Sequence, residues 1–231
     1  MSNARTFEIS NLGPLSQLRT GRLPRRLVQL MFGLTLFGVS IGLMVRGHLG
    51  LAPWDVLHSG LVHWVPITLG QAIVAASFVV LVFWWPLGER PGSGALASAL
   101  VVGLVTGLTL TVVPEVQGWV GQASLLVGGV VLNGLASAIY IGAQLGRGPR
   151  DGLMTGLARR TGRSLRLVRT LLEVVVLALG LALGGAAGVG TLLFAALIGP
   201  VTQFFLPWVA VRQAEPPQGG TPSAGEEAER G

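Results

Sequence analysis

Long apolar runs separated by short polar stretches dominate the chain. Six of these runs have about the 20 residues that an α-helix needs to cross the hydrocarbon core of a bilayer. They cover residues 27–45, 68–87, 94–113, 123–143, 165–184 and 189–209. Apolar and polar residues do not alternate in them as they would in barrel strands, and a spanning segment must satisfy its own backbone hydrogen bonds. We therefore predict an all-α, polytopic helical membrane protein with six spans.

Two shorter segments between these spans share one pattern. Residues 49–61 read LGLAPWDVLHSGL, and residues 145–157 read LGRGPRDGLMTGL. Seven of the thirteen positions are identical at a constant offset of 96 residues, which gives the motif L-G-x-x-P-x-D-x-L-x-x-G-L. The same offset also aligns glycines and leucines in the flanking spans. We infer an internal duplication of residues 27–107 onto residues 123–203.

The duplication divides the chain into five parts. We expect a basic, cytoplasmic N-terminal segment, a first membrane repeat, a short linker, a second membrane repeat and a disordered tail rich in Pro, Gly, Ala and Glu. These parts are residues 1–26, 27–113, 114–122, 123–210 and 211–231.

The positions of the arginines bear on the orientation of the two halves. If the motif segments do not cross the membrane, each half has three spans and the second half is inverted; if they cross, each half has four spans and the halves are parallel. Inverted halves place the arginine-rich residues 1–26 and 146–166 in the cytoplasm and leave the arginine-free residues 114–122 outside, as the positive-inside rule requires. Arg46 is an exception. We therefore predict two inverted three-span repeats with both termini cytoplasmic.

Each motif segment then forms a re-entrant element or a short half-helix. Proline suits the first position of a helix, and glycine permits the turn before it. Irregular backbone at membrane depth is tolerated only beside protein or a water-filled cavity, and in many secondary transporters such elements meet at a substrate site. We assign the shaping of the half-helices to Gly50, Pro53, Gly60, Gly146, Pro149 and Gly156.

The motif segments also hold the candidate ligands for a substrate or an ion. Asp55 and Asp151 are acids at membrane depth, which are functional candidates by default, although an acid at this position also caps a helix. His58 lies three residues after Asp55, on the same helical face, where the two can form a proton-responsive pair. Arg147 and Arg150 either bind an anion or a lipid headgroup or enforce cytoplasmic placement.

Two further features concern the spans themselves. Glu173 lies inside the fifth apolar run, and Arg169 four residues earlier or Arg166 one turn further back can pair with it. We favour a structural ion pair. Tryptophans near the ends of the runs predict an interfacial belt. They are Trp64, Trp84, Trp85, Trp119 and Trp208.

Composition supports the membrane class and excludes several chemistries. Of the 231 residues, 51% are hydrophobic and only 11% are charged, whereas soluble domains carry about a quarter charged residues. The net charge of +6 does not indicate nucleic acid, because the arginines flank apolar runs. The absence of cysteine excludes disulfides and thiol chemistry. We find no nucleotide or hydrolase motif, so we expect no enzyme, no cofactor and no metal site.

The paired motif, with one apolar span before each copy and two after it, resembles the bacterial YczE/YitT-like membrane protein family. The likeness covers about residues 20–210, and its specific part is the two motif copies. It implies a multi-pass protein of the bacterial inner membrane and no established substrate.

Three functions are open at this point. The first is a small secondary transporter or exporter of an unknown small molecule or ion, working by alternating access between inverted repeats. The second is a non-transporting factor that assembles with or regulates another membrane protein. The third is a lipid-handling protein, which Arg147 and Arg150 suggest. Besides the bilayer, another membrane protein or a second copy of the chain are the partners we consider.

Overall fold

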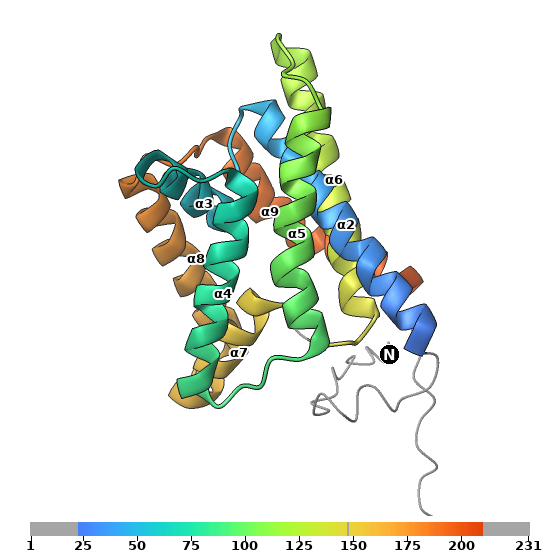
Figure 1. The fold of residues 1–231 in the computed structure, drawn as a ribbon, viewed down its shortest axis with the longest axis vertical. Helices are drawn as coiled ribbons and strands as arrows, with labels where there is room; N and C mark the ends of the chain where they lie inside the picture. Colours follow the sequence, from blue (N-terminus) through green and yellow to red (C-terminus); the bar gives the residue numbers. More distant parts are fainter. Residues whose placement is uncertain (1–22, 147, 210–231) are drawn as a thin grey trace, which may run out of the picture.

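The computed structural model describes residues 23–146 and 148–209, and the regular structure in these ranges is entirely α-helical (Figure 1). All six apolar runs form helices, and the two motif segments form short helices. The expectations for residues 1–22, for Arg147 and for the tail from residue 210 lie outside the described residues. The helices are α2 (Leu23–Gly47), α3 (Pro53–Trp64), α4 (Leu69–Leu87), α5 (Ser93–Val112), α6 (Trp119–Gly142), α7 (Pro149–Thr161), α8 (Leu165–Ala182) and α9 (Val189–Val209).

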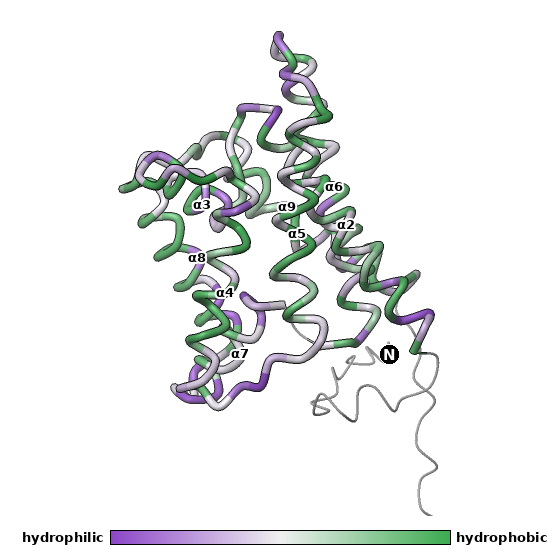
Figure 2. The backbone as a smooth tube through the Cα atoms, in the orientation of Figure 1, coloured by the Kyte–Doolittle hydropathy of each residue, from purple (hydrophilic) through white to green (hydrophobic). Residues whose placement is uncertain are grey.

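Five of the described helices, α2, α4, α5, α6 and α9, are long and apolar enough to cross a membrane. Helix α8 is not among them, because its 18 residues include Arg166, Arg169 and Glu173. Figure 2 shows hydrophobic residues along the long helices and hydrophilic residues gathered toward the helix ends and on α7. The fold is thus that of a helical membrane protein, and of the six expected spans the fifth, α8, is the one that does not meet this criterion.

The same local signals bound helices α4 and α8. The side chains of Thr68 and Ser164 each accept a hydrogen bond from the backbone N–H three residues later, which caps the helix that follows. Gly88 and Gly184, just beyond the two helices, have left-handed φ values of 69° and 81°. Both pairs of positions are 96 residues apart, so the duplication extends to the helix caps.

The turns into α3 and α7 are also alike. Gly50 and Gly146 have φ values of 118° and 113°, in a region that favours glycine. Pro53 and Pro149 are the first residues of the two helices, where the missing N–H of proline has no cost. The expected short helices are therefore present, each entered through a glycine turn.

Each turn is joined to a helix by one backbone hydrogen bond. The N–H of Gly94 in α5 donates to the carbonyl of Leu145 at 3.2 Å, and the N–H of Gly190 in α9 donates to the carbonyl of Leu49 at 2.7 Å. The two bonds join equivalent residues at the 96-residue offset. The first half thus anchors the turn of the second, and the second half anchors the turn of the first.

Helices α2 and α6 form the centre of the bundle and run antiparallel. A Cβ atom added to Gly33 would lie 2.8 Å from the backbone N of Tyr140, and one added to Gly47 would lie 3.0 Å from the carbonyl oxygen of Gln122. The beginning of each helix therefore packs against the end of the other. Helix α5 packs on α2, and α9 packs on α6.

The short helices pack across the two halves. Helix α3 lies against α8 and α7 lies against α4, and Figure 1 shows α3 and α7 near opposite ends of α4. A Cβ atom on Gly60 would meet Leu183 at 2.8 Å, and one on Gly156 would meet Leu87 at 3.1 Å. These contacts are again equivalent, and each short helix is held by the last-but-one helix of the other half.

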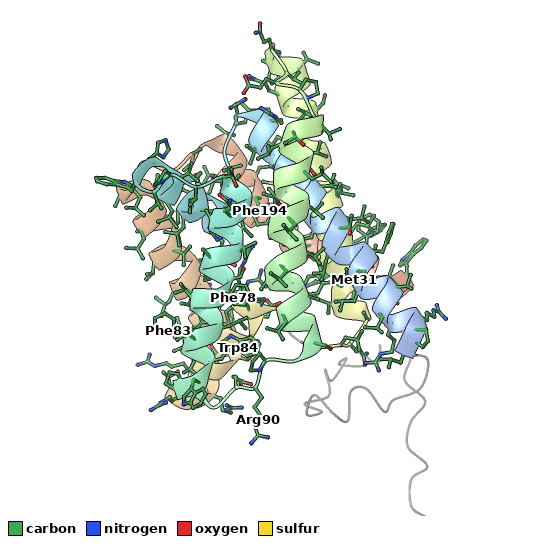
Figure 3. The ribbon with its side chains drawn as sticks, in the orientation of Figure 1. Met31, Phe78, Phe83, Trp84, Arg90 and Phe194 are labelled. Carbon is green, nitrogen blue, oxygen red and sulfur yellow. The ribbon has the colours of Figure 1, made fainter. Side chains whose placement is uncertain are left out.

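Four of the five tryptophans of the predicted belt are exposed, as the prediction requires, and the prediction is wrong for Trp84. Trp84 is only 3% exposed, and its indole Nε1 donates to the carbonyl of Pro149 at 2.9 Å. Figure 3 shows it on α4, beside α7. Its position at the end of an apolar run suggested the membrane–water interface, but α7 covers this end of α4. The exposed members are Trp64, Trp85, Trp119 and Trp208.

The first long helix begins at Leu23, before the expected start of the span at residue 27, and it includes a buried arginine. Arg26 is 2% exposed, and it donates from Nε to the carbonyl of Ala143 at 2.9 Å and from Nη2 to the carbonyl of Gln144 at 2.6 Å. It therefore satisfies carbonyls at the end of α6, as basic side chains commonly do at helix C-termini.

Arg46, the exception to the charge rule, is neutralised locally. Its Nη1 lies 3.0 Å from Oε1 of Glu115, and its Nη2 donates to the carbonyl of Leu110. A paired arginine at the end of a helix adds little net charge to its side of the membrane.

Candidate functional site

A cavity of about 240 Å³ lies in the bundle, where α3 and α7 begin. All eight described helices contribute to its wall, and Pro53 and Pro149 both line it. An apolar cavity of about 150 Å³ holds benzene. The cavity therefore has room for a ligand on the order of ten non-hydrogen atoms.

The lining of the cavity follows the duplication. Eight pairs of residues at the 96-residue offset have both members in its wall. The charged members all belong to the second half: Arg150 replaces Trp54, and Arg169 replaces Ile73. The pairs are Phe37/Asn133, Ala52/Gly148, Pro53/Pro149, Trp54/Arg150, Ile73/Arg169, Ser77/Glu173, Ser98/Phe194 and Val102/Ile198.

Arg150 lies among aromatic rings. Its guanidinium carbon is 5.5 Å from the ring centroid of Trp54 and 5.8 Å from that of Phe37, within the range of cation–π attraction. In the described part of the chain it has neither an ion pair nor a hydrogen bond. Its positive charge is thus held in place by rings while no side-chain anion neutralises it directly.

Asp151, the neighbour of Arg150, is bonded to a tyrosine. The hydroxyl of Tyr140 donates to Oδ2 of Asp151 at 2.6 Å. The ring of Tyr140 packs edge-on against Phe37, with ring centroids 6.1 Å apart. The candidate acid of the second motif therefore lines the cavity, and it is oriented by a residue of α6.

Arg169 and Glu173 complete the charged wall. Nε of Arg169 lies 3.1 Å from Oε1 of Glu173, so the expected ion pair is present. Its place on the cavity was not expected from the sequence, which favoured a purely structural pair. The equivalent residues Ile73 and Ser77 also line the cavity, but no motif in the sequence marks either pair as part of a site.

Asp55 and His58 form a separate buried pair. Nδ1 of His58 lies 3.1 Å from Oδ1 of Asp55, and both residues are 2% exposed. Neither lines the cavity, although Trp54, the residue before Asp55, does. The structure thus brings Arg150 and Asp151 to the cavity and leaves Asp55 and His58 behind its wall. Within the described ranges, no three His, Asp or Glu side chains form a metal-binding group.

Two residues of the wall carry buried polar atoms without a hydrogen-bond partner in the described part of the chain. They are the indole Nε1 of Trp54 and the amide Oδ1 of Asn133. The amide nitrogen of Asn133 donates to the hydroxyl of Ser40 at 2.7 Å, which fixes the orientation of the side chain. One unused donor and one unused acceptor thus belong to residues of this wall, and such atoms are uncommon in folded proteins.

Comparisons with known proteins assign the chain to a family. Residues 24–207 match the profile of a family of unknown function, DUF6198. An uncharacterized protein of Haemophilus influenzae is 38% identical over 181 residues, which cover 78% of this chain and 83% of that protein. The membrane protein YczE of Bacillus subtilis is 32% identical, over 76% of this chain and 82% of its own length. The protein YyaS of the same organism is 30% identical, over 77% and 90%.

No solved structure matches the chain. The matched residues include both motif copies and nearly the whole helical bundle, so the likeness covers the cavity as well as the spans. The chain belongs to the DUF6198 family and is homologous to the membrane protein YczE, in agreement with the resemblance carried by its paired motif.

Proposed function

We propose that the chain is a small secondary transporter that works by alternating access between two inverted repeats, with the cavity as its substrate site. The observation that carries this proposal is the cavity wall built from equivalent residue pairs at the start of both short helices. Secondary transporters with inverted repeats bind substrate near the membrane midplane, at the interface of the repeats, where discontinuous helices begin.

Three observations support the inversion of the repeats. Helices α2 and α6 are equivalent and antiparallel. The equivalent helices α3 and α7 lie near opposite ends of α4 (Figure 1). Arg169 and Glu173 line the cavity, which gives the charged helix α8 a polar environment on one side and allows it to serve as the fifth of six spans.

In this mechanism the residues of the site have distinct roles. Arg150 and Asp151 bind the substrate in the cavity, and Tyr140 orients Asp151. The buried pair of Asp55 and His58 takes up a coupling proton behind the wall, one residue from Trp54. No step requires bond chemistry, and we assign no catalytic role.

Topology labelling tests the inversion. Ser59 and Thr155 are partly buried, whereas His63 and Arg159 are exposed and equivalent, near the ends of α3 and α7. The chain has no cysteine, so single His63→Cys and Arg159→Cys variants need no background removal. We expect an impermeant maleimide to label His63→Cys only from outside intact cells and Arg159→Cys only in inverted vesicles. Labelling of both from one side would contradict inverted repeats and favour parallel halves of four spans each.

A second labelling experiment tests alternating access without a known substrate. Ser137 lies in the cavity wall on α6, and a cysteine there is small enough to be tolerated. We expect a small impermeant thiol reagent to reach Ser137→Cys from either side of the membrane. Reaction from one side only would contradict alternating access.

One observation favours a second function, a factor that assembles with another membrane protein or with a second copy. Helix α9 packs mainly against α6, with a hydrogen bond from Gln29 of α2 to the carbonyl of Val209 at its end, and much of its length is exposed. A partner that copurifies stably and protects α9 from labelling, together with one-sided access to Ser137→Cys, would favour this function over transport.

A further inference from the structure

The bundle is closed between α4 and α5 but open between the equivalent helices α8 and α9. Helices α4 and α5 pack closely, and a Cβ atom on Gly103 would lie 2.5 Å from the carbonyl oxygen of Gly70. Among the described helices, α8 packs against α3 and α7, and α9 packs against α6. A Cβ atom on Gly199, the equivalent of Gly103, would meet nothing within 4 Å. We call the space between these two helices the α8–α9 opening.

The sequence explains why the second half does not close. The position of Gly70 is taken by Arg166, and the position of Gly107 is taken by Gln203. Glycine lets two membrane helices approach to backbone contact, whereas the long side chains of arginine and glutamine hold them apart. Both Arg166 and Gln203 are exposed, as expected for side chains that border an opening.

The cavity reaches this opening. Its wall includes Arg169 and Glu173 from α8, and Ile198, Gly199 and Gln203 from α9. The outer residues of both helices are apolar and exposed, as lipid-facing residues are. A ligand dissolved in the bilayer therefore has a route into the cavity between α8 and α9 that does not pass through either aqueous side.

The charges of the wall select the head group of such a ligand. Glu173 is paired with Arg169, and Asp151 accepts a hydrogen bond from Tyr140. In the part of the chain that the structure describes, Arg150 lies over two aromatic rings and has neither an ion pair nor a hydrogen bond. A guanidinium without an anionic partner is suited to a carboxylate or phosphate, which it binds through charge-assisted hydrogen bonds.

Taking the cavity as the substrate site of the proposed transporter, we infer that the substrate is a single-chain amphiphile with one anionic head group, which enters from the lipid through the α8–α9 opening. The head group, a carboxylate or a phosphate, binds Arg150. The cavity holds the head and the first carbons beside Phe194 and Ile198, since its volume suits on the order of ten non-hydrogen atoms. The rest of the chain lies in the opening.

Photolabelling of the full-length protein in phosphatidylcholine nanodiscs tests this inference. Three alkyl probes carry a diazirine near a carboxylate, a phosphate or a hydroxyl head group, and mass spectrometry identifies the labelled peptides. We expect an anionic probe to label α7, α8 or α9 about tenfold more strongly than the alcohol, and Arg150→Gln to remove this advantage. Labelling by the carboxylate alone indicates a fatty-acid-like substrate, and labelling by the phosphate alone indicates a lysophospholipid-like one.

A blocking variant tests the route. Gly199→Phe adds a ring at the opening and leaves the Arg150 residue in place, and Gly128→Phe is its matched control, because a Cβ atom on that helical glycine also meets nothing within 4 Å. We expect Gly199→Phe to lower anionic labelling several-fold and Gly128→Phe to leave it unchanged. The inference is overturned if the alcohol labels the protein as strongly as the anionic probes do, or if Gly199→Phe does not lower anionic labelling. It is also overturned if a second copy of the chain covers α8 and α9.

These results are independent of the transport proposal. Anionic labelling through the opening stands even if His63→Cys and Arg159→Cys react from the same side, in which case the amphiphile is bound but the inverted transporter is wrong. Conversely, if the topology is inverted but the anionic probes do not label the cavity, the transporter proposal stands and the anionic amphiphile is rejected as its substrate.

Discussion

The guanidinium of Arg150 lies 5.5 Å from the ring centroid of Trp54, and the two residues occupy the same position in the two copies of the motif. In the proposed arrangement, with two repeats related by a twofold axis, only residues close to that axis can meet their own equivalents. This contact therefore marks the place where the two halves face each other, and it lies in the wall of the cavity. The two copies have diverged there into a cation and the ring that best attracts it.

We predict that Trp54 and Arg150 are energetically coupled. Cation–π attraction contributes about 0.5–2 kcal/mol, with the higher values at desolvated sites. In a double-mutant cycle, Trp54→Ala and Arg150→Ala should therefore each lower the free energy of unfolding. The loss in the double variant should be smaller than the sum of the two single losses by about this cation–π contribution. The measurement is reversible unfolding of the protein in bicelles. Effects that add to within about 0.5 kcal/mol would contradict the coupling.

We predict that two buried tryptophans respond differently to the same substitution. The indole Nε1 of Trp84 donates to the carbonyl of Pro149 at 2.9 Å, whereas Nε1 of Trp54 has no partner in the described structure. Replacement by phenylalanine removes a hydrogen bond only in Trp84→Phe, because Nε1 of Trp54 has none to lose in the described structure. Trp84→Phe should cost about 1 kcal/mol more than Trp54→Phe. Equal costs in the same unfolding assay would show that the hydrogen bond at Trp84 contributes nothing.

We predict that any side chain at Gly152 in α7 lowers the free energy of unfolding. A Cβ atom there would overlap the indole ring of Trp84, which is itself buried between α4 and α7 (Figure 3). Overpacking of this kind costs about 1–3 kcal/mol. Gly152→Ala should destabilise the protein by this amount, while Gly128→Ala, which has open space, should be neutral or slightly stabilising.

A second substitution identifies the cause of the Gly152→Ala effect. Trp84→Leu removes the ring that the new methyl group would strike, so Gly152→Ala should cost much less in a Trp84→Leu background than in the wild type. An unchanged cost in that background would place the strain elsewhere in α7.

Hydrophobic patterning and the repeat were enough to predict most of the fold. The apolar runs predicted the long helices because lipid-facing and interhelical positions are both apolar, and Pro53 and Pro149 predicted the starts of the short ones. Packing between distant segments was not predictable in the same way. Nothing near Trp84 in the sequence shows that α7 covers it, because the contact joins residues more than 60 positions apart.

The candidate site was predictable in part, and for a similar reason. The motif identified Arg150 and Asp151, which line the cavity, since both belong to a segment whose irregular start must be sheltered. It could not separate Asp151 from Asp55, although one faces the cavity and the other faces His58. That difference comes from partners that the two halves do not share: Tyr140 bonds to Asp151 where the first half has Met44, and His58 bonds to Asp55 where the second half has Met154.

The buried pair of Asp55 and His58 leads to a last prediction. Both residues are 2% exposed and lie 3.1 Å apart, so removal of one partner leaves the other buried without its hydrogen bond. His58→Leu should lower the free energy of unfolding by about 3–5 kcal/mol if the carboxylate stays charged. The double variant Asp55→Leu/His58→Leu should be more stable than His58→Leu alone, because it leaves no buried polar group unpaired. If the double variant is less stable than His58→Leu, Asp55 has a stabilising partner other than His58. Asp55→Asn, which keeps a hydrogen-bonding side chain beside His58, should fold with a smaller loss of stability, and this makes it the variant of choice for testing proton coupling in the reconstituted protein.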